Sequence, residues 1–455
     1  MQDVIDPATG KTIRSFKEMG NKKINKAIQL SHNTFQHWQH TPMEKRAHHL
    51  REAARVLEEG KEAYAMLITR EMGKRLVEAR SEVEKCAWVC LYYAQNAERF
   101  LQDEFVSTDA AKSYVSYRPL GPLLGIMPWN FPFWQVFRFA APNLMAGNTI
   151  LLKHAPNVPG CAEALEEIFE KAGYPENAFT SLHIDVKKTK KVIQNPLVAA
   201  VTLTGSVGAG QSVAAQAGKV GKKTVLELGG SDPYLILEDA DVEHAVDVCT
   251  RSRLLNSGQS CIGAKRFIVM KEVYDNFLEA FRERLKAARM GDPIDESTRL
   301  GPLARQDLRE QLHKQVKGSL KKGAKKVIGG KMPKGKGFFY PPTILTQVNK
   351  GCPAYHEELF GPVASVFKVK DEREAVQIAN DTSYGLGAAV FTKDTERGEK
   401  LAREHLQAGA CFVNEMVKSD PRLPFGGIKD SGFGRELSHY GLREFTNPKT
   451  VYIKH

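Results

Sequence analysis

The sequence predicts an α/β protein with two largely parallel sheets, for three reasons. A run of helical patterns over 22–102 comes first, and from residue 119 onward short apolar runs alternate with helical segments. A second alternating region begins near residue 231. Strand–helix–strand alternation is typical of parallel sheets that helices cover on both faces, and 455 residues suffice for two such units.

The first elements are expected to be amphipathic helices followed by a β-ribbon. Within 22–102, one apolar stripe with the spacing i, i+3, i+4 and i+7 consists of Leu50, Ala53, Ala54 and Leu57. Residues 105–118 change to aromatic and β-branched residues with polar neighbours, which favours a ribbon.

The two alternating regions supply the expected sheets. In the first, the predicted strands are 149–152, 180–184, 199–203 and 225–228, and the predicted helices are 158–172 and 210–217. In the second, the predicted strands are 266–270, 363–369, 388–391 and 411–414, and the predicted helices are 273–288 and 372–380. Residues 450–454 form an expected edge strand, which pairing with another subunit would cover.

Composition argues against several kinds of partner. The formal net charge is +12, but the lysine-rich segments 187–191 and 317–336 lack interleaved aromatic residues, which indicates a solvated surface and no nucleic acid partner. Seven scattered cysteines argue against a disulfide framework and fit a reducing compartment. Cys86 and Cys90 lie four apart in a helical pattern without further ligands at useful spacing, so core packing is favoured over a metal site.

The same sequence predicts a cytoplasmic protein without a membrane span. The first residues carry neither the basic region nor the apolar core of a signal peptide. The most apolar long stretch, 120–146, is interrupted by prolines and by Arg138, which a membrane span would not tolerate easily.

Cys261 is the first candidate for a reactive residue. It ends the segment Gly258-Gln259-Ser260-Cys261, between a helical pattern and a predicted strand. Small, turn-prone neighbours do not suit a core position, whereas a loop suits a reactive thiolate. The alternative is a buried apolar cysteine, which is the commoner role of a lone cysteine.

Glu227 is the second candidate, because it ends a predicted apolar strand just before the Gly229-Gly230 turn. In a parallel sheet that end faces the ligand crevice. A carboxylate between two leucines is costly unless it is paired or functional, and burial would raise its pKa toward that of a general base. The alternative is a surface glutamate at the end of a strand.

Two loops could stabilise negative charge. In Pro128-Trp129-Asn130-Phe131-Pro132, two prolines would hold the Asn130 amide where it can stabilise an oxyanion, although a proline-braced turn is the alternative. Residues 204–210 follow a strand and open a helix, so free N–H groups and the helix dipole would form an anion site. The glycines of this loop do not follow the G-x-G-x-x-G spacing.

These four segments, in this order, resemble the aldehyde dehydrogenase superfamily over essentially the whole chain. Further matching segments are Asp6-Pro7-Ala8-Thr9-Gly10, Leu152-Lys153, Glu357-Glu358-Leu359-Phe360-Gly361-Pro362 and Pro424-Phe425-Gly426-Gly427-Ile428-Lys429-Asp430-Ser431-Gly432. The resemblance implies an aldehyde dehydrogenase-like fold with two Rossmann-like domains. The implied division is a cofactor-binding domain (1–104 and 119–229), a catalytic domain (230–429), an oligomerisation ribbon (105–118 and 446–455) and a return segment (430–445).

The resemblance also implies roles for residues at matching positions. Cys261 corresponds to the nucleophile, Glu227 to the general base and Asn130 to the oxyanion-hole amide. The implied cofactor contacts are Trp129, Lys153, Pro156, Gly205, Ser206, Glu358 and Phe360. The implied reaction oxidises an aldehyde to an acid through a thiohemiacetal and a thioester that water hydrolyses, without a metal.

Cofactor choice is expected to be relaxed. Family members that select NAD often carry a glutamate three residues after the position of Lys153, and here that position is Pro156. Because no carboxylate would repel a 2′-phosphate there, and Lys153 and His154 could tolerate one, use of both NAD and NADP is expected.

Three segments resemble the short bacterial succinate-semialdehyde dehydrogenases: 153–158, 228–233 and 435–439. Arg138, on the helix after Asn130, corresponds to an arginine that grips the distal carboxylate, and Ser419 corresponds to a second contact. Aromatic neighbours favour this role over that of a helix-surface arginine. A further family arginine is replaced by Leu255, so a broad-range activity on medium-chain aldehydes or other semialdehydes is the alternative.

Two other functional classes fit the sequence less well than a dehydrogenase. A non-catalytic protein that kept the fold would not need Asn130, Glu227 and Cys261. A thiol esterase would leave the cofactor residues unexplained. The expected partners are therefore a small-molecule aldehyde and further copies of the chain, in a homodimer or homotetramer.

Overall fold

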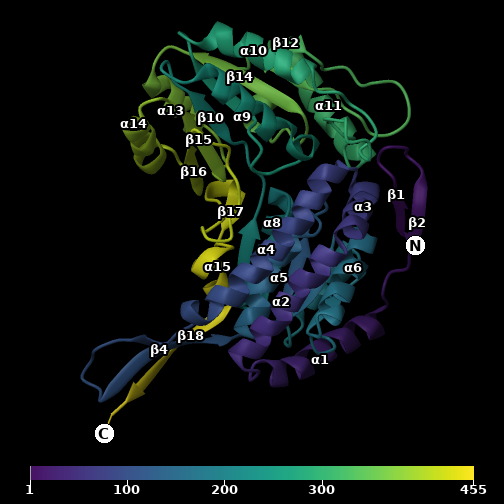
Figure 1. The fold of residues 1–455 in the computed structure, drawn as a ribbon, viewed down its shortest axis with the longest axis vertical. Helices are drawn as coiled ribbons and strands as arrows, with labels where there is room; N and C mark the ends of the chain where they lie inside the picture. Colours follow the sequence, from purple (N-terminus) through teal and green to yellow (C-terminus); the bar gives the residue numbers. More distant parts are fainter. Residues whose placement is uncertain (1, 455) are drawn as a thin grey trace.

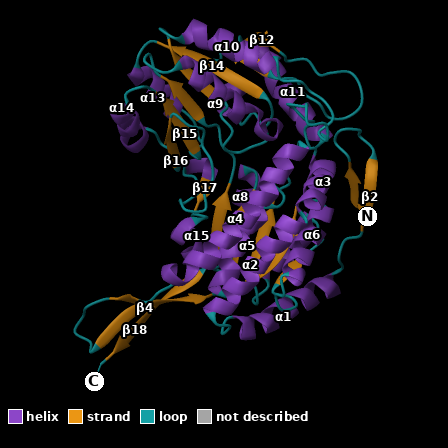
Figure 2. Cartoon of the chain, in the orientation of Figure 1, coloured by secondary structure: helices purple, strands orange, loops and turns teal. Residues whose placement is uncertain are grey.

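The alternation of strands and helices produces two sheets, each in its own lobe, and a ribbon that projects from one lobe (Figure 1). The coordinates are a computed structural model that describes residues 2–454, so the outermost residues of the expected first domain and ribbon, Met1 and His455, lie outside the described residues. Figure 2 shows helices on both sides of the strands in each lobe, as expected of an α/β protein.

The first sheet has six strands in the order β17-β9-β8-β5-β6-β7. They are β5 (Pro122–Met127), β6 (Thr149–His154), β7 (Phe179–Ser181), β8 (Ala200–Thr204), β9 (Lys223–Glu227) and β17 (Gly432–Phe433). Neighbours are parallel except β17, which returns from late in the chain and runs antiparallel to β9. The carboxyl ends of the five parallel strands therefore meet at one edge of the sheet.

Helices cover both faces of this sheet because its strands are apolar on both sides. In β5, Leu123 packs into the cluster formed by α2–α6, whereas Leu124 packs into the cluster that includes α1, α7 and α8. The helices are α1 (Asn21–Trp38), α2 (Met43–Glu59), α3 (Lys61–Met72), α4 (Leu76–Phe100), α5 (Trp134–Ala146), α6 (Pro159–Lys171), α7 (Val186–Gln194), α8 (Val207–Gly218) and α15 (Ser438–Glu444).

The second sheet has seven strands in the order β12-β13-β14-β11-β10-β15-β16, and only the β12–β13 pair is antiparallel. The strands are β10 (Pro233–Ile236), β11 (Arg266–Met270), β12 (Lys325–Ile328), β13 (Thr343–Thr346), β14 (Val363–Val369), β15 (Gly387–Phe391) and β16 (Ala410–Val413). The helices are α9 (Val242–Leu254), α10 (Tyr274–Lys286), α11 (Gln306–Lys321), α12 (Pro353–His356), α13 (Glu372–Asn380) and α14 (Thr395–Lys400). Short helical turns add Leu255–Gly258, Leu401–His405 and Lys429–Ser431.

The remaining strands form two small sheets. β1 (Gln2–Ile5) and β2 (Thr12–Phe16) make an N-terminal hairpin. β3 (Glu104–Phe105), β4 (Lys112–Pro119) and β18 (Thr446–Ile453) make the projecting ribbon, in which β18 pairs antiparallel with the whole of β4. The predicted edge strand therefore exists and lies at the outer edge of the ribbon.

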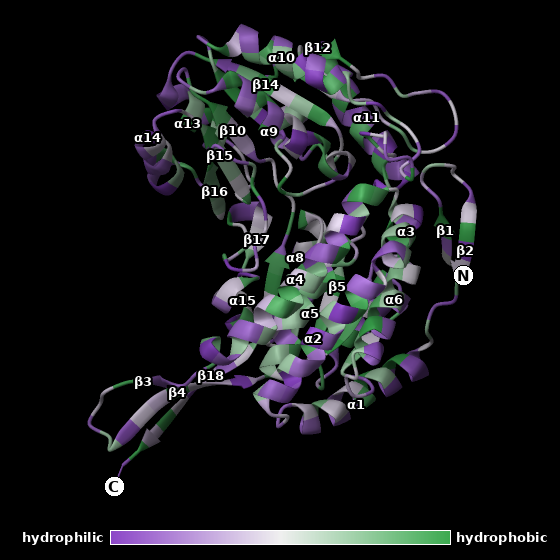
Figure 3. Ribbon diagram, viewed as in Figure 1, coloured by the Kyte–Doolittle hydropathy of each residue, from purple (hydrophilic) through white to green (hydrophobic). Residues whose placement is uncertain are grey.

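Hydropathy follows the layers, with hydrophobic strands inside and hydrophilic outer faces on helices such as α10 (Figure 3). The expected strands 266–270 and 363–369 and the helix 372–380 are confirmed to the residue. The stripe Leu50, Ala53, Ala54 and Leu57 is buried, as are Cys86 and Cys90. No helix within residues 2–454 is long and apolar enough to cross a membrane.

Candidate active site

Two cavities meet at Cys261. The strand-end cavity, about 430 Å³, lies at the carboxyl ends of the first sheet and is lined by residues including Asn130, Gly205, Ser206, Glu358 and Phe360. The helix-side cavity, about 380 Å³, is lined by residues including Lys85, Trp134, Arg138, Ser419 and Phe425. Cys261 and Gln135 line both cavities, so the thiol is accessible from two directions.

The loop that carries Cys261 begins with a rare backbone conformation. Asn256, Ser257 and Gly258 have φ values of 53°, 55° and 76°, three consecutive residues in the left-handed region. A β-carbon at Gly258 would overlap the carbonyl group of Gly361, so only glycine fits there. Strain of this kind persists where the surroundings hold the backbone in place, as at many active sites.

Two buried cations hold the same loop. Arg253 donates to the carbonyl oxygens of Gly258 (2.6 Å) and Ala264 (2.7 Å), and Lys265 Nζ donates to those of Ser260 (2.9 Å) and Cys261 (2.7 Å). These contacts fix the Cys261 backbone between the two sheets. Neither cation was predicted from the sequence, because their targets are backbone atoms and leave no motif.

The surroundings of Cys261 favour the protonated thiol over the thiolate. Burial raises the pKa of Cys261 to about 12, and the charges of Arg138 and Lys265 oppose that rise. The carboxylates of Glu358 and Glu227 act in the same direction as burial. A further positive charge in the strand-end cavity would therefore favour the reactive thiolate.

The Asn130 amide faces the cysteine loop with a defined orientation. Its Oδ1 accepts from Gln135 Nε2 (3.1 Å), and its Nδ2 donates to the carbonyl oxygen of Gln259 (3.1 Å). Asn256 Nδ2 also donates to the Asn130 carbonyl oxygen (2.7 Å), which ties the two loops together. Because an amide nitrogen carries two hydrogens, Asn130 keeps one N–H for an oxyanion.

Glu227 is the last residue of β9, as expected, but among the described residues it is set back from both cavities. Neither carboxylate oxygen has a hydrogen-bond partner among residues 2–454. Burial raises the pKa of Glu227 well above its usual value, and Arg138 opposes the shift. Burial therefore favours the neutral form of this carboxyl group, and when it is ionised its charge raises the pKa of Cys261.

Most of the expected cofactor residues line the strand-end cavity. Ser206 caps α8, with its Oγ accepting from the Ala209 N–H (3.4 Å), so the loop directs free N–H groups outward. Trp129 and Phe360 meet edge to face at 5.8 Å. A β-carbon at Gly229 would lie 2.6 Å from Glu358 Oε2, so the Gly-Gly turn makes room for this carboxylate.

Two of the expected cofactor residues lie beyond the lining of the strand-end cavity. Lys153 is buried near the end of β6, and Pro156 is exposed on the turn that follows. His154 is buried, contacts the Pro132 carbonyl oxygen (2.9 Å), and its pKa is lowered to about 4, mainly by burial. Burial therefore favours the neutral form of His154, whose ring contacts the Asn130 loop, and its expected tolerance of a phosphate stays a prediction.

Arg138 lines the helix-side cavity as expected, but its charge is already paired. Its guanidinium forms a buried ion pair with Glu436 and lies 4.7 Å from the centre of the Phe425 ring. It is 2 % exposed, which excludes the surface alternative. Glu436 lies far along the chain and was not predicted, because sequence spacing gives no sign of the contact.

Ser419 also lines this cavity, and it has two partners that were not predicted. Its Oγ lies 2.8 Å from Lys85 Nζ on α4 and 3.1 Å from Trp134 Nε1 on α5. Both partners are donors, so the Ser419 oxygen accepts from each.

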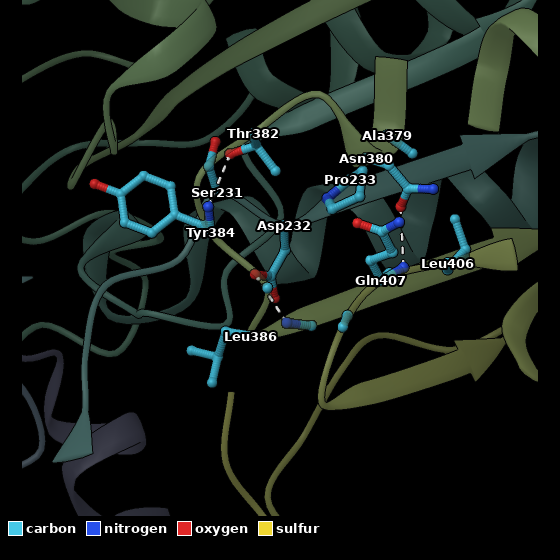
Figure 4. A pocket seen from close by; sticks show the side chains of 14 residues that line it. Ser231, Asp232, Pro233, Ala379, Asn380, Thr382, Tyr384, Leu386, Leu406 and Gln407 are labelled. Atoms are coloured by element: carbon cyan, nitrogen blue, oxygen red, sulfur yellow. Dashed lines mark hydrogen bonds between the residues drawn. The ribbon is translucent and has the colours of Figure 1, made fainter. Parts of the chain in front are cut away.

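A third cavity lies beside the second sheet and is too small for these roles. It has a volume of about 10 Å³ and is lined by Ser231, Asp232, Asn380, Tyr384 and Gln407 among others (Figure 4). Asp232 Oδ1 accepts from the Gly387 N–H (3.1 Å), and burial raises the pKa of Asp232 to about 7. This volume suits about one water molecule. No group of three or more potential metal ligands clusters within residues 2–454.

The family follows from a match over nearly the whole sequence. The model described as "Aldehyde dehydrogenase family" matches residues 1–451, and the chain therefore belongs to the aldehyde dehydrogenase family. The family and the α/β architecture expected from the sequence are both confirmed.

Similar proteins within this family carry more specific names. A probable succinate-semialdehyde dehydrogenase of Synechocystis, named for NADP(+), is 49% identical over 99% of this chain and 99% of its own. A succinate semialdehyde dehydrogenase of Escherichia coli, named for NAD(P)+, is 45% identical over 98% of this chain and 97% of its own. The crystal structure of succinic semialdehyde dehydrogenase from Streptococcus pyogenes in complex with NADP+ is similar with a TM-score of 0.98, at 38% identity and full coverage of both chains.

Proposed function

We propose that this protein oxidises succinate semialdehyde to succinate with NAD(P)+ as hydride acceptor. The observation that carries the proposal is the position of Cys261, where the strand-end cavity meets the helix-side cavity. A nucleophile placed there can contact an aldehyde from one side and a cofactor from the other.

The strand-end cavity fits a nicotinamide dinucleotide. The Ser206 cap and the start of α8 offer N–H groups to a pyrophosphate, and Glu358 offers a carboxylate to ribose hydroxyls. When bound, NAD(P)+ would accept a hydride from the carbon attached to Cys261, which leaves a thioester. In this proposal the first lobe binds the cofactor and the second lobe supplies the nucleophile.

The residues of the chain carry the other steps. The Cys261 thiolate bonds to the aldehyde carbon, and the resulting oxyanion accepts from the free N–H of Asn130 and, by family resemblance, from the Cys261 backbone N–H. After the oxidation, Glu227 takes a proton from a water that attacks the thioester, and the acid leaves with the thiol restored. Because Glu227 is set back, this water must enter between it and Cys261.

Both cofactors are proposed, as expected from the sequence. Pro156 places no carboxylate on the turn after β6, so residue 156 does not repel the 2′-phosphate of NADP. The Synechocystis relative is named for NADP(+) and the Escherichia coli relative for NAD(P)+, which supports the proposal.

The substrate assignment is supported by the relatives' names and by charge. Arg138 and Ser419, the expected carboxylate contacts, both line the helix-side cavity. The alternative, a broad-range activity on medium-chain aldehydes, is favoured by the apolar part of this lining, which includes Phe131, Leu255 and Ile262.

The ribbon supports a proposed homodimer or homotetramer. Its outer strand β18 has exposed Tyr452 and Ile453, and Phe105 on β3 is 70% exposed. Pairing of ribbon edges between subunits would cover these groups. The scattered cysteines, which fit a reducing compartment, favour the cytoplasm as the location.

Formation of reduced nicotinamide tests the proposed function directly. Succinate semialdehyde and butanal would be compared, each with NAD and with NADP. We expect turnover with both cofactors and a kcat/KM for succinate semialdehyde at least about 10-fold above that for butanal. Equal values for the two aldehydes would favour the broad-range alternative, and no signal with any aldehyde would contradict the dehydrogenase.

A further inference from the structure

The helix-side cavity has a cationic wall, but most of its buried charge is already balanced. Lys74 pairs with Glu82, Arg75 with Glu78 (2.8 Å) and Arg138 with Glu436. Arg299 and Lys418 also line the cavity but are exposed at its rim, where solvent screens them. Among the described residues that line the cavity, this leaves one cation inside it, Lys85 on α4.

Lys85 has no carboxylate within 4.0 Å among the described residues. Its Nζ donates to Ser419 Oγ (2.8 Å) and lies 4.2 Å from the centre of the Trp134 ring. The nearby carboxylates are engaged elsewhere: Glu82 pairs with Lys74, and Asp420 pairs with Arg422 (2.6 Å). A partly buried ammonium without a counterion is costly, and an anionic ligand would relieve that cost.

Ser419 reinforces the preference for an anion. Its oxygen accepts from both Lys85 Nζ and Trp134 Nε1, which occupies its two lone pairs. Its hydroxyl hydrogen is therefore left to donate. An ammonium and a free hydroxyl hydrogen, side by side in the cavity that contains Cys261, match the two oxygens of a carboxylate.

We propose that Lys85 is a specificity-determining residue whose ammonium, together with the Ser419 hydroxyl, binds the distal carboxylate of the aldehyde substrate. The inference rests on the proposed function and deepens it. Arg138 still lines the same cavity, but Glu436 balances its charge, so Lys85 supplies the net positive charge that an acidic aldehyde requires. Lys85 and Leu255 line the same cavity, so α4 supplies a cation to the cavity in which the family's other arginine is absent.

The protonation of Lys85 gives the proposal a pH signature. Burial and, to a smaller extent, the positive charge of Arg138 on α5 lower the pKa of Lys85 to about 8. Asp420, and Glu82 and Cys86 on α4 itself, oppose the shift. Lys85 is charged below this pKa and loses its charge as the pH rises through about 8, so carboxylate binding to the free enzyme weakens above that pH.

The test compares Lys85→Met with Lys418→Met, which removes one positive charge from the exposed rim of the same cavity. The measured quantity is kcat/KM for succinate semialdehyde divided by kcat/KM for butanal, so that effects on the shared chemistry cancel. We expect Lys85→Met to lower this ratio about 10- to 100-fold, the range for losing a charge-assisted hydrogen bond. Lys418→Met should change it less than about 2-fold, and Lys85→Arg should restore part of the loss.

The wild-type enzyme provides a second measurement that does not depend on how a variant folds. The same ratio of kcat/KM values would be measured between about pH 6 and about pH 10. We expect it to fall above about pH 8, where Lys85 loses its charge. A ratio that stays constant with pH, or that Lys85→Met leaves unchanged, overturns the role of Lys85. The proposed function fails in a distinguishable way, because the wild-type protein itself would then show no preference for succinate semialdehyde.

Discussion

The strand-end cavity and the helix-side cavity share Cys261, yet they are built from different kinds of structure. The strand-end cavity is formed largely by loops that follow parallel strands, such as the Asn130 loop after β5 and the Gly205-Ser206 turn after β8. The helix-side cavity is formed by side chains of α4 and α5 together with residues 416–425, which are distant along the chain. One cavity therefore depends mainly on backbone geometry and the other on side-chain identity.

The two cavities also differ in how their charges are balanced. In the strand-end cavity Glu358 is held by Lys265 (3.4 Å) and by the Gly230 N–H (3.1 Å), so its charge is compensated. In the helix-side cavity the pair of Arg138 and Glu436 is balanced, whereas Lys85 is not. In our proposal the strand-end cavity holds the cofactor, and the unpaired ammonium of Lys85 in the helix-side cavity selects the substrate.

The largest expected effect is at the point where the cavities meet. Cys261→Ala should lower kcat by about 10⁴-fold or more, because it removes the nucleophile, while cofactor binding persists in an intact strand-end cavity. Turnover and NADP binding by protein fluorescence would be measured together. Cys411→Ala, a partly buried cysteine on β16 away from both cavities, is the matched control. Substantial activity in the Cys261→Ala protein would remove Cys261 from its assigned role.

The buried pair in the helix-side cavity should be visible in stability. Arg138→Met leaves Glu436 buried without its counterion, and we expect the free energy of unfolding to fall by about 3 kcal/mol. The double variant Arg138→Met/Glu436→Leu removes both charges and should recover most of that loss. Urea unfolding of the three proteins checks this, and equal stability of wild type and Arg138→Met would contradict a charge balance by Glu436.

Glu227 lines neither cavity, so its substitution tests the release of the acid separately from the roles of the two cavities. Glu227→Gln should slow acid release by about 10²- to 10³-fold through loss of the general base, while the first burst of reduced cofactor remains. Rapid-mixing kinetics separate the two phases. Since the pKa of Glu227 is raised, the slow phase of the wild type should accelerate as the pH increases and the carboxyl group ionises. A slow phase that the substitution does not change would argue against Glu227 as the base.

The smallest expected effect is on cofactor choice. Pro156→Glu introduces a carboxylate on the exposed turn after β6, and repulsion of the 2′-phosphate should raise KM for NADP by about 10-fold relative to KM for NAD. Initial rates with each cofactor measure the shift, and Pro156→Gln controls for the change of backbone. Identical ratios in the Glu and Gln variants would show that charge at residue 156 has no part in the choice.

Periodic patterns predicted several elements correctly, but not the special backbone near the nucleophile. The strands 266–270 and 363–369 are runs of apolar residues whose length and β-branched content are typical of buried strands. Asparagine enters the left-handed region more readily than most residues, but nothing local predicts this conformation at Ser257, which follows Asn256. They are held by contacts with distant segments, such as Asn256 with the Asn130 carbonyl oxygen.

Motifs and local periodicity, which are properties of neighbouring residues, were enough to predict the family, the α/β class and candidates for nucleophile, base and oxyanion donor. They did not predict which charges of the helix-side cavity are paired and which are not. Lys85 and Ser419 are separated by 334 positions, and Arg138 meets Glu436 from a different part of the chain. Whether a charge is buried, paired or left free depends on which distant segments pack together, and packing also sets the local polarity on which each pKa depends.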